Sequence, residues 1–497
     1  MPAFTINSRA QAIQQRPSNL TLVLDQGSHA SRAALFSAEG SLLQLETVNV
    51  STHNPEKAHF EQDAHEILDS LQTLLTQIDR SYARNIKFCG LCTQRSTVVA
   101  WHKQTGQALS PAISWRDLRA SKLMQQLKPE FPDIERITGL PFSAHYSASK
   151  INWLLNNNAG VKQAAKEHQL CIAPLSSFLL FHLLKERPFV IDHSNAQRSL
   201  LFDIEKRCWS EELLQLFEIS RLYLPECKPI VHLYGHLKEL NIPLTAACGD
   251  QNAVLHAYPQ TPDNNTLVNI GTGAFILSNA LEQRAHAEKA RLLRSIVNSR
   301  NDRVRLVTEG TVNGAGAALT HILESAPCEN LFEQLPRWLN DITSPPIFIN
   351  TVSGLGSPWW CDAGPAEFIS GDTHSLEEGY VAIIESIVFL IDANLQRLQR
   401  FSQGSSPEVL FLSGGLSRLD ALCQKLADLC GLNILRFEDA EASARGCAWL
   451  ARQLQGSNNQ QWKVLEASHK FRPSENPLLM RRYQQFIAEL YRRCDRS

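Results

Sequence analysis

The sequence has little net charge and no long apolar run. Its 48 Lys and Arg residues nearly balance 50 Asp and Glu residues, which leaves a formal net charge of −2. A protein with such balanced charge has no general attraction to nucleic acid or to an anionic membrane. Apolar stretches such as LSSFLLFHLL, which starts at Leu175, are too short to span a bilayer. We therefore expect no nucleic-acid partner and no membrane partner, and any anion site should be local.

Two further signals are missing, namely a secretory leader and a set of paired cysteines. The first 20 residues, MPAFTINSRAQAIQQRPSNL, are polar and contain no apolar core of the kind that a secretory signal needs. Only Cys89 and Cys92 form a C-x-x-C pair, and no second pair exists to complete a zinc site. That pair lies in IKFCGLC, a predicted strand, which would place the two side chains on opposite faces. The sequence predicts a cytoplasmic protein whose cysteines are reduced core thiols.

The order of the predicted elements indicates an α/β protein with two domains. A chain of 497 residues is too long for one compact core. Residues 20–50 alternate strand and turn, and residues 62–79 have the apolar spacing of three and four that is typical of a helix. After the polar stretch 258–265, TLVNIGTGAFILSN repeats the same strand, small-residue turn and strand. We expect a domain boundary near 255–265.

The predicted organisation has four parts. They are an N-terminal extension (1–19), a first domain (20–257), a second domain (265–455) and a C-terminal helical tail (456–497). The tail contains NPLLMRRYQQFIAELYRRC, a basic amphipathic helix. Such a helix could dock on the second domain or bind to a membrane surface. Docking is favoured because membrane-surface helices usually have a wider apolar face.

Four stretches share one form, an apolar strand that runs into small or acidic residues. They are LVLDQGS, PLTAACGDQNAV, LVNIGTG and VLFLSGG. Each alone could be an ordinary turn. In open α/β sheets, however, ligands bind beyond the carboxyl ends of the strands, and backbone N–H groups in small-residue turns can bind phosphate oxygens. Two such stretches in each half predict a nucleotide-binding cleft between the domains.

A family resemblance accompanies these stretches. In order along the chain, LDQGSHASRAALFSAEG, GLCTQRSTVVAWHKQTG, CGDQNAV, VNIGTGAFIL and LFLSGGLSRLDALCQKLADLCGLNI resemble motifs of the FGGY family of carbohydrate kinases, closest to its glycerol kinase branch. The resemblance runs from about residue 20 to the end. It implies two actin-like, ribonuclease-H-like domains that close on ATP, Mg²⁺ and a small polyol or sugar. Homodimers or homotetramers are common in the family.

The resemblance also implies roles for individual residues. Asp250 resembles the catalytic base, which takes a proton from the acceptor hydroxyl as that oxygen attacks the γ-phosphate. Asp25 resembles the acidic residue that holds Mg²⁺, an ion that takes few protein carboxylates. The positions that match acceptor-binding residues are Arg95, Ser96, Trp115, His145 and Gln251. Those that match ATP-binding residues are Gly27, Ser28, His29, Arg32, Gly271, Thr272, Gly273, Gly316, Thr320, Gly414, Gly415 and Leu419.

At four positions the sequence departs from glycerol kinases. They have Glu, Tyr, Thr and Asn where this chain has Ser96, His145, His29 and Leu419, although a shift of one residue would align the Tyr with Tyr146. Loss of the Glu removes an acceptor of hydrogen bonds from glycerol hydroxyls, and such a loss changes specificity strongly. The sequence therefore predicts an ATP-dependent kinase for a polyol or sugar other than glycerol.

Two other functions are compatible with the same fold. One is a nucleotide-binding regulatory protein that has lost catalysis, because the changed positions lie in the predicted site. The other is an actin-like ATPase that acts on a protein partner. Arg95, Trp115 and Asp250 argue against the ATPase, since such proteins have no polyol pocket to line.

Overall fold

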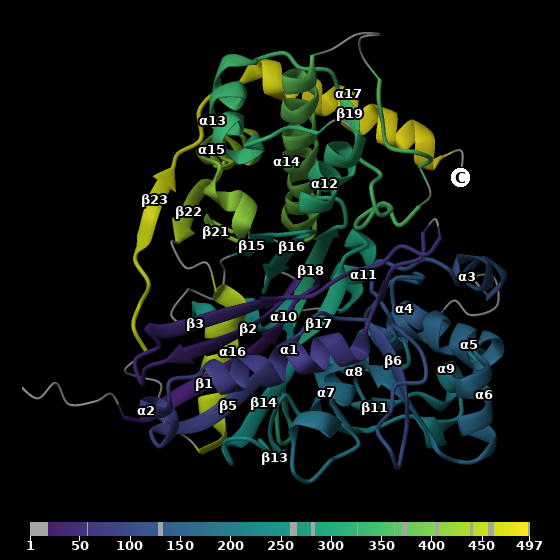
Figure 1. Cartoon of the computed structure of the whole chain (residues 1–497). Helices are drawn as coiled ribbons and strands as arrows, with labels where there is room; N and C mark the ends of the chain where they lie inside the picture. The colour runs from purple at the N-terminus through teal and green to yellow at the C-terminus, as the bar shows by residue number, and fades with distance from the viewer. Residues whose placement is uncertain are drawn as a thin grey trace, which may run out of the picture.

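The structure, a computed structural model, describes residues 18–56, 58–127, 133–258, 266–279, 284–325, 327–361, 363–369, 375–402, 407–437, 441–455 and 462–495. We call residues 20–258 the first half and residues 266–495 the second half. Figure 1 shows most of the first half below and most helices of the second half above. Most of the predicted boundary at 255–265 lies outside the described residues, as does most of the predicted N-terminal extension.

The first half is built on a mixed sheet of six strands. In spatial order they are β13 (Val231–His236), β14 (Pro243–Gly249), β5 (Ile86–Thr93), β1 (Leu20–Gln26), β2 (Ala30–Phe36) and β3 (Leu42–Asn49). The central strands β1, β5 and β14 are parallel, while β2, β3 and β13 run antiparallel to their neighbours. The parallel strands bring their carboxyl ends to one edge of the sheet, where ligands bind in open α/β folds.

The second half contains a sheet of seven strands with the same central pattern. The order is β17 (Leu293–Arg300), β18 (Arg303–Val312), β16 (Ala274–Ser278), β15 (Thr266–Ile270), β21 (Val409–Ser413), β22 (Asn433–Phe437) and β23 (Ala467–Phe471). Here β15, β21 and β22 are parallel, and the antiparallel pair β15–β16 corresponds to β1–β2. The similar openings of the two halves of the sequence are therefore an internal repeat of structure.

Helices cover both sheets, and local sequence explains where the main ones begin and end. Helix α1 (Ala64–Gln77) begins after Asp63, whose carboxylate accepts a hydrogen bond from the backbone N–H of His65. Helix α14 (Leu376–Phe401) begins with a capping box between Ser375 and Glu378. Helix α15 (Asp420–Cys430) ends at Gly431, which has a left-handed φ of 72°.

The remaining elements mostly surround the first sheet. The other helices of the first half are α2 (Arg80–Ala83), α3 (Ser121–Leu127), α4 (Ile134–Thr138), α5 (Ser147–Asn157), α6 (Ala159–Lys166), α7 (Leu175–Leu183), α8 (His193–Gln197), α9 (Glu211–Leu216) and α10 (Asp250–Val254). Those of the second half are α11 (Arg284–Ala290), α12 (Gly316–Ser325), α13 (Leu331–Asp341), α16 (Ala442–Arg452) and α17 (Pro477–Cys494). A smaller sheet joins β4 (Glu61–Gln62), β7 (Ala112–Ile113), β6 (Val98–His102) and β8 (Leu170–Pro174).

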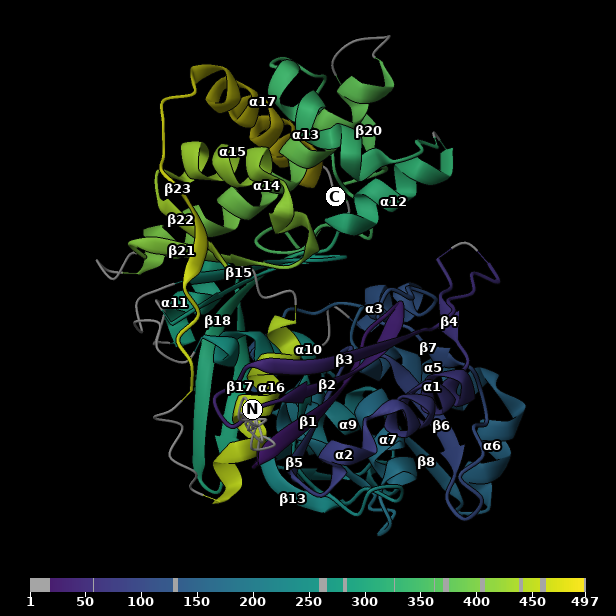
Figure 2. The same cartoon turned by 60° about the vertical axis from the view of Figure 1, so that its left-hand side comes forward.

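The end of the chain contacts both halves. Helix α16 lies within the predicted second domain but packs on β1, β5 and β14 of the first sheet, as Figures 1 and 2 show. Strand β23 then joins the edge of the second sheet, and α17 packs against α14 and α15. Within the described residues, no helix is long and apolar enough to cross a membrane.

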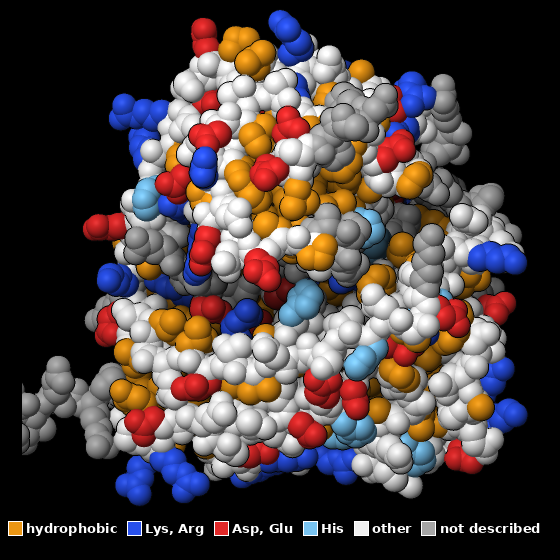
Figure 3. All heavy atoms as spheres, turned by 45° about the horizontal axis from the view of Figure 1, so that its top comes forward, with side chains coloured by type: hydrophobic (Ala, Val, Ile, Leu, Met, Phe, Trp, Pro, Cys, Tyr) orange, Lys and Arg blue, Asp and Glu red, His pale blue; other side chains and the backbone are white. Residues whose placement is uncertain are grey.

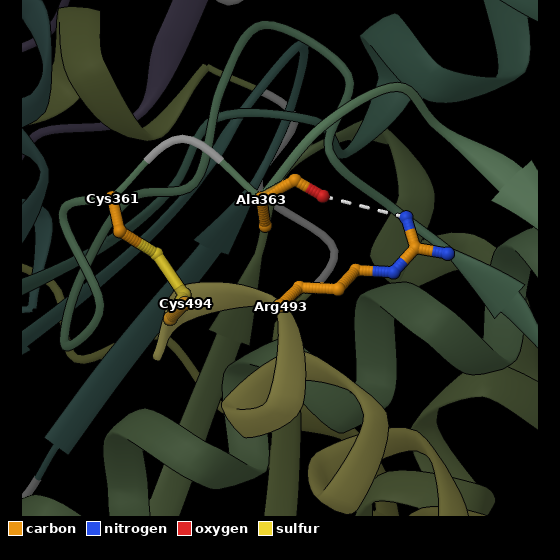
Figure 4. The surroundings of a disulfide bond; sticks show 4 residues. All are labelled: Cys361, Ala363, Arg493 and Cys494. Carbon is orange, nitrogen blue, oxygen red and sulfur yellow. Dashed lines mark hydrogen bonds between the residues drawn. A yellow bond between two sulfur atoms is a disulfide. The ribbon is translucent and has the colours of Figure 1, made fainter. Parts of the chain in front are cut away.

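The cysteines correct one prediction. Cys361 and Cys494 form a disulfide, with Cα atoms 5.8 Å apart, so the expectation of reduced thiols is wrong for this pair (Figure 4). The sulfurs meet because α17 returns across the second half and ends beside the loop that carries Cys361. The other ten cysteines are free. Cys89 and Cys92 belong to different core clusters, as their opposite faces on β5 require.

Candidate active site

A cleft with a volume of about 310 Å³ lies between the two halves and is lined by both. Figure 3 shows the hollow between the halves, with acidic and basic side chains near it. The predicted residues that line it from the first half are Asp25, Gly27, Ser28, His29, Arg32, Arg95, Ser96, Trp115, His145, Asp250 and Gln251. From the second half, Gly271, Thr272, Gly273 and Gly414 line it. Most of the predicted site residues thus share one cleft.

The turn between β1 and β2, residues 25–30, is called the aspartate turn. Its backbone closes with a hydrogen bond of 2.9 Å from Gly27 N–H to the carbonyl of Ala30. The Asp25 carboxylate lies 3.9 Å from the Arg32 guanidinium. Burial raises the pKa of Asp25, and Arg32 only partly opposes this. Burial, with a smaller contribution from the charge of Arg116, lowers the pKa of His29, so its imidazole is neutral at pH 7.

The turn between β15 and β16, residues 270–274, is called the glycine turn. Gly271 N–H donates to the carbonyl of Gly273 at 2.9 Å, and Gly316 N–H donates to the carbonyl of Gly271 at 2.9 Å. A Cβ atom on Gly273 would lie 2.9 Å from the carbonyl oxygen of Val312, whereas one on Gly271 would meet only Gly273 O at 3.9 Å. The turn therefore requires glycine at 273 for packing, and Gly271 keeps the cleft side open.

Four predicted ATP-binding residues lie outside the cleft lining. Gly316 supports the glycine turn from behind, and the hydroxyl of Thr320 donates to the Gly316 carbonyl at 3.2 Å. Gly415 is exposed next to Gly414. Leu419 is 6% exposed and belongs to the core of the second half. Their contacts with a nucleotide stay predictions.

Asp250 stands at the end of β14, where that strand passes into α10. Its carboxylate accepts a hydrogen bond of 2.7 Å from the backbone N–H of Gln251 and lies 3.9 Å from Nε of Arg95. Burial raises the pKa of Asp250 to about 6, which Arg95 opposes and the negative charge of Asp25 reinforces. A carboxyl with this pKa is ionised at neutral pH yet basic enough to accept a proton from an alcohol in the transition state.

Arg95 is fixed by a buried ionic network between the halves. Its guanidinium donates to both oxygens of Glu309 on β18, at 3.2 and 3.0 Å. Arg198 also binds Glu309, and the Ser295 hydroxyl donates to that carboxylate at 2.7 Å. Although burial opposes ionisation, the charges of Arg198 and Arg95 lower the pKa of Glu309 to about 2. The sequence analysis assigned no role to Arg198 or Glu309, because only the fold brings them together.

Two side chains that depart from glycerol kinases lie at the end of the cleft where the acceptor is predicted to bind, which we call the acceptor end. Ser96, with φ of 65°, donates from its hydroxyl to the carbonyl of Arg198 at 3.0 Å. The ring nitrogens of His145 lie 3.2 Å from the carbonyl of Trp115 and 3.1 Å from that of Ser353. Burial, followed by the charge of Lys150, lowers the pKa of His145 to about 4, so the ring is neutral.

Several residues outside the predicted set also line the cleft, and one of them is Tyr146, the alternative match to the family's Tyr. Tyr146 lies beside His145, and its hydroxyl is close enough to Arg198 for the charge to act on it. Phe275 follows the glycine turn, with its ring centroid 4.9 Å from the Arg95 guanidinium carbon. Thr311, Asn313 and Trp360 add a wall from the second half. Phe275 belongs to VNIGTGAFIL, one of the stretches that resemble family motifs, so its place there was the available signal.

The carboxylates of the cleft could hold a hard metal ion. Among the described residues, no group of three or more His, Cys, Asp and Glu side chains gathers to form a complete protein metal site. Asp25 and Asp250 both line the cleft, and the negative charge of Asp25 contributes to the raised pKa of Asp250. One or two carboxylates with nearby space for phosphate oxygens fit Mg²⁺, which keeps several waters and shares substrate phosphates.

The indole ring of Trp115 lies between the acceptor end of the cleft and the aspartate turn. Its Nε1–H donates to the Ser28 hydroxyl at 3.0 Å, and its backbone N–H donates to the Thr97 hydroxyl at 3.1 Å. The indole is thereby held at a fixed orientation between the two parts of the cleft. A fixed apolar wall suits the carbon chain of a polyol or sugar.

Comparisons with known proteins agree with this architecture. The model for the N-terminal domain of the FGGY family of carbohydrate kinases matches residues 20–254, and that for its C-terminal domain matches residues 266–452. A glycerol kinase from Burkholderia cenocepacia is 30% identical over 448 residues, covering 86% of this chain and 88% of the relative. A glycerol kinase from Rhodopirellula baltica is 30% identical over 467 residues, covering 90% and 85%.

Solved structures share the fold. The glycerol kinase of Plasmodium falciparum with ADP has a TM-score of 0.79 and 24% identity, and the match covers 97% of this chain and 98% of that one. A ligand-bound xylulose kinase from Lactobacillus acidophilus has a TM-score of 0.78 and 18% identity, with 96% and 97% covered. The fold is the two-domain, actin-like α/β fold of sugar kinases. The chain belongs to the FGGY family of carbohydrate kinases.

Proposed function

We propose that the protein transfers the γ-phosphoryl group of ATP, with Mg²⁺, to a hydroxyl of a small polyol or sugar other than glycerol. Membership of the family makes it a sugar or polyol kinase, and the acceptor and the residue roles are the proposal. The observation that carries it is the position of Asp250. This carboxylate has a pKa of about 6, lies 3.9 Å from Arg95, and faces a cleft lined by both the aspartate turn and the glycine turn.

The proposed mechanism uses alignment and charge. Asp250 would accept the proton of the attacking hydroxyl, while Arg95, which Glu309 holds in place, would donate to an acceptor oxygen. The backbone N–H groups of Thr272 and Gly273 in the glycine turn, and of Ser28 and His29 in the aspartate turn, would bind phosphate oxygens, since those of Gly271 and Gly27 close the turns themselves. Mg²⁺, held by Asp25 through water, would neutralise charge on the phosphates.

The residues at the acceptor end support an acceptor other than glycerol. No carboxylate follows Arg95, because Ser96 stands there and its hydroxyl already donates to a backbone carbonyl. The ring nitrogens of His145 lie 3.2 Å from the carbonyl of Trp115 and 3.1 Å from that of Ser353, and the neutral imidazole can donate its single N–H to only one of them. A site with these changes has no carboxylate at position 96 to accept hydrogen bonds from two adjacent hydroxyls, so its preferred acceptor should differ.

A screen for acceptor-dependent ADP release tests the proposal. The protein is incubated with Mg·ATP and a panel of polyols, ketoses and aldoses that includes glycerol. Turnover with one acceptor well above that with glycerol, and its loss in Asp250→Asn, is the expected result. Asp341→Asn is a matched control, because this exposed residue lies on α13 and pairs only with Arg337 within the described part of the chain. ATP binding without turnover on any acceptor would instead identify a regulatory protein that has lost catalysis.

The assembly state is a separate part of the proposal. Homodimers and homotetramers are the states that the family resemblance implies. Light scattering at several protein concentrations distinguishes them from a monomer of 55.7 kDa.

A further inference from the structure

A second cavity lies in the second half, away from the cleft. It has a volume of about 670 Å³ and is bounded by α14, α15, α17 and the loop at residues 357–361. That volume is within the range of small-molecule sites. None of the residues that line it also lines the cleft. We call it the helix cavity.

Two buried polar atoms of the helix cavity lack partners. Asp392 is fully buried, its Oδ2 accepts a hydrogen bond of 2.7 Å from Gln396, and the nearby Tyr483 hydroxyl partly opposes the rise in the pKa of this carboxyl that burial causes. The Oδ1 atom itself has no hydrogen-bond partner among the described residues. Trp359 is 4% exposed, and its Nε1–H likewise has no acceptor in that part of the chain. Both side chains line the cavity. Buried polar groups are nearly always paired, and the cavity lining covers both of these atoms, so a molecule bound in the cavity would pair with them after a small shift of that lining.

Two arginines lie at the same cavity. Arg397 and Arg400 are three residues apart on α14, where side chains share a face. Arg397 donates to the Tyr491 hydroxyl at 3.3 Å, and the guanidinium of Arg400 lies 5.7 Å from the Phe401 ring. Neither arginine pairs with a carboxylate in the described part of the chain, so both charges are available to an anion.

We propose that the helix cavity binds a small organic anion that carries hydroxyl groups. Its charged group would bind the forked guanidinium groups of Arg397 and Arg400. One of its hydroxyls would donate to Asp392 Oδ1, and another of its oxygens would accept from Trp359 Nε1–H. A carboxylate or a phosphate ester satisfies the same pattern. The site is independent of the acceptor end of the cleft and of the proposed phosphoryl transfer.

The helix cavity is connected to the cleft through one short loop. The Ser357 hydroxyl donates to Asn394 Oδ1 on α14 at 2.6 Å, and it accepts from the backbone N–H of Thr311 at 2.6 Å. Thr311 and Trp360 line the cleft, whereas Trp359 lines the helix cavity. The disulfide from Cys361 to Cys494 anchors the end of this loop. An anion that pairs with Trp359 would therefore restrain the segment that positions Trp360.

Calorimetric titration without nucleotide tests the site directly. The anion probes are D-glucose 6-phosphate and D-gluconate. Two partial probes serve as controls: sorbitol has the hydroxyl groups without the charge, and inorganic phosphate has the charge without the polyol chain. We expect at least one anion probe to bind with a Kd below about 1 mM and more tightly than either partial probe. The tighter of the two shows whether phosphate or carboxylate is preferred.

Two variants locate the binding. Arg397→Gln removes one charge, and Trp359→Phe removes the unpaired N–H while it keeps an aromatic ring. Each should weaken binding about tenfold, as expected for loss of a hydrogen bond to a charged or buried group. Arg136→Gln, at an exposed arginine on α4 of the first half, is the matched control and should bind as the unmodified protein does. Absence of binding by both anion probes at about 10 mM, or unchanged affinity in both variants, overturns the proposal.

Hydrogen exchange tests the connection to the cleft without any activity measurement. Amides of residues 357–361 should exchange more slowly when the anion probe is bound, and this protection should be lost in Arg397→Gln. Unchanged exchange in a protein that binds the probe would overturn the connection through the loop. Because neither measurement uses ATP, an inactive protein would disprove the proposed function without affecting this test.

Discussion

The aspartate turn and the glycine turn occupy equivalent places in the two sheets but are built differently. Each connects the first antiparallel pair of its sheet, β1–β2 or β15–β16, and each faces the cleft. The aspartate turn carries an acid, an imidazole and, two residues beyond its end, the guanidinium of Arg32. After Ile270 the glycine turn carries small residues only, and the backbone N–H groups of Ala315, Gly316 and Ala317 donate hydrogen bonds that support it from behind.

The difference indicates that the two halves have different roles in the site. A turn of small residues presents backbone N–H groups and leaves room for a phosphate, as Gly271 shows. A turn with side chains can also hold a metal and adjust charge. The same asymmetry appears at the next strands, since β14 leads to Asp250 whereas its counterpart β22 ends at Phe437. Charge and proton chemistry should therefore depend on the first half, and phosphate positioning on the second.

Replacement of Asp250 is expected to have the largest effect. Asp250→Asn keeps the shape of the side chain but removes the base, so kcat should fall by about a thousandfold or more while ATP still binds. Steady-state kinetics and ATP titration measure the two effects. Because the pKa of Asp250 is raised in the folded protein, its ionised carboxyl destabilises the fold above a pH of about 6. At pH 8, Asp250→Asn should therefore melt at a higher temperature than the unmodified protein. Activity within tenfold of the unmodified protein would exclude Asp250 as the base.

Replacement of Asp25 should have the next largest effect and tests the metal role of the aspartate turn. Asp25→Asn should lower kcat by about a hundredfold and raise the Mg²⁺ concentration needed for half-maximal rate, because a charged ligand of the ion's shell is lost. Chelation with EDTA should abolish turnover in the unmodified protein. Thr272→Val in the glycine turn is the comparison, and its Mg²⁺ requirement should stay the same. An equal shift in both variants would contradict the division between the turns.

The sequence predicted the parts of the site that lie at strand ends. Asp25, Asp250 and the glycine turn each follow a short apolar run, and parallel strands bring such ends together. Contacts between distant segments had no local signal. Arg198 and Glu309 are 111 residues apart, and Cys361 and Cys494 are 133 apart, so periodicity carries no information on either pair. Packing of α16 on the first sheet was missed for the same reason, since an amphipathic pattern does not name its partner.

Two alanine substitutions in the glycine turn separate packing from phosphate binding. Gly273→Ala should destabilise the protein by about 1–3 kcal/mol, because its Cβ would lie 2.9 Å from the carbonyl of Val312. Gly271→Ala meets no protein atom closer than 3.9 Å and should leave stability nearly unchanged. Its methyl group would face the cleft, so the KM for ATP should rise about tenfold. Thermal melts and ATP kinetics check the pair, and identical behaviour of the two variants would contradict this reading of the turn.

The pH dependence of the rate should reflect the first half alone. Below a pH of about 6, kcat/KM should fall tenfold for each unit of pH, since protonation of Asp250 removes the base. The glycine turn contains no titratable side chain and should add no second ionisation. Rates measured from pH 5 to pH 8 in constant ionic strength check this. A midpoint near 4 would mean that Asp250 has an ordinary pKa in the free enzyme.

Replacement of His29 should have the smallest effect, although this residue is the most unusual feature of the aspartate turn. Its imidazole is neutral at pH 7, so it brings no charge to the phosphates, and a hydroxyl can donate one hydrogen bond equally well. His29→Ser should therefore change the KM for ATP by less than about threefold and leave kcat unchanged. Arg32→Gln, which removes a charge beside Asp25, should raise the same KM more. If His29→Ser instead raised the KM by tenfold or more, the aspartate turn would bind phosphate through a specific histidine contact, and the backbone would not suffice.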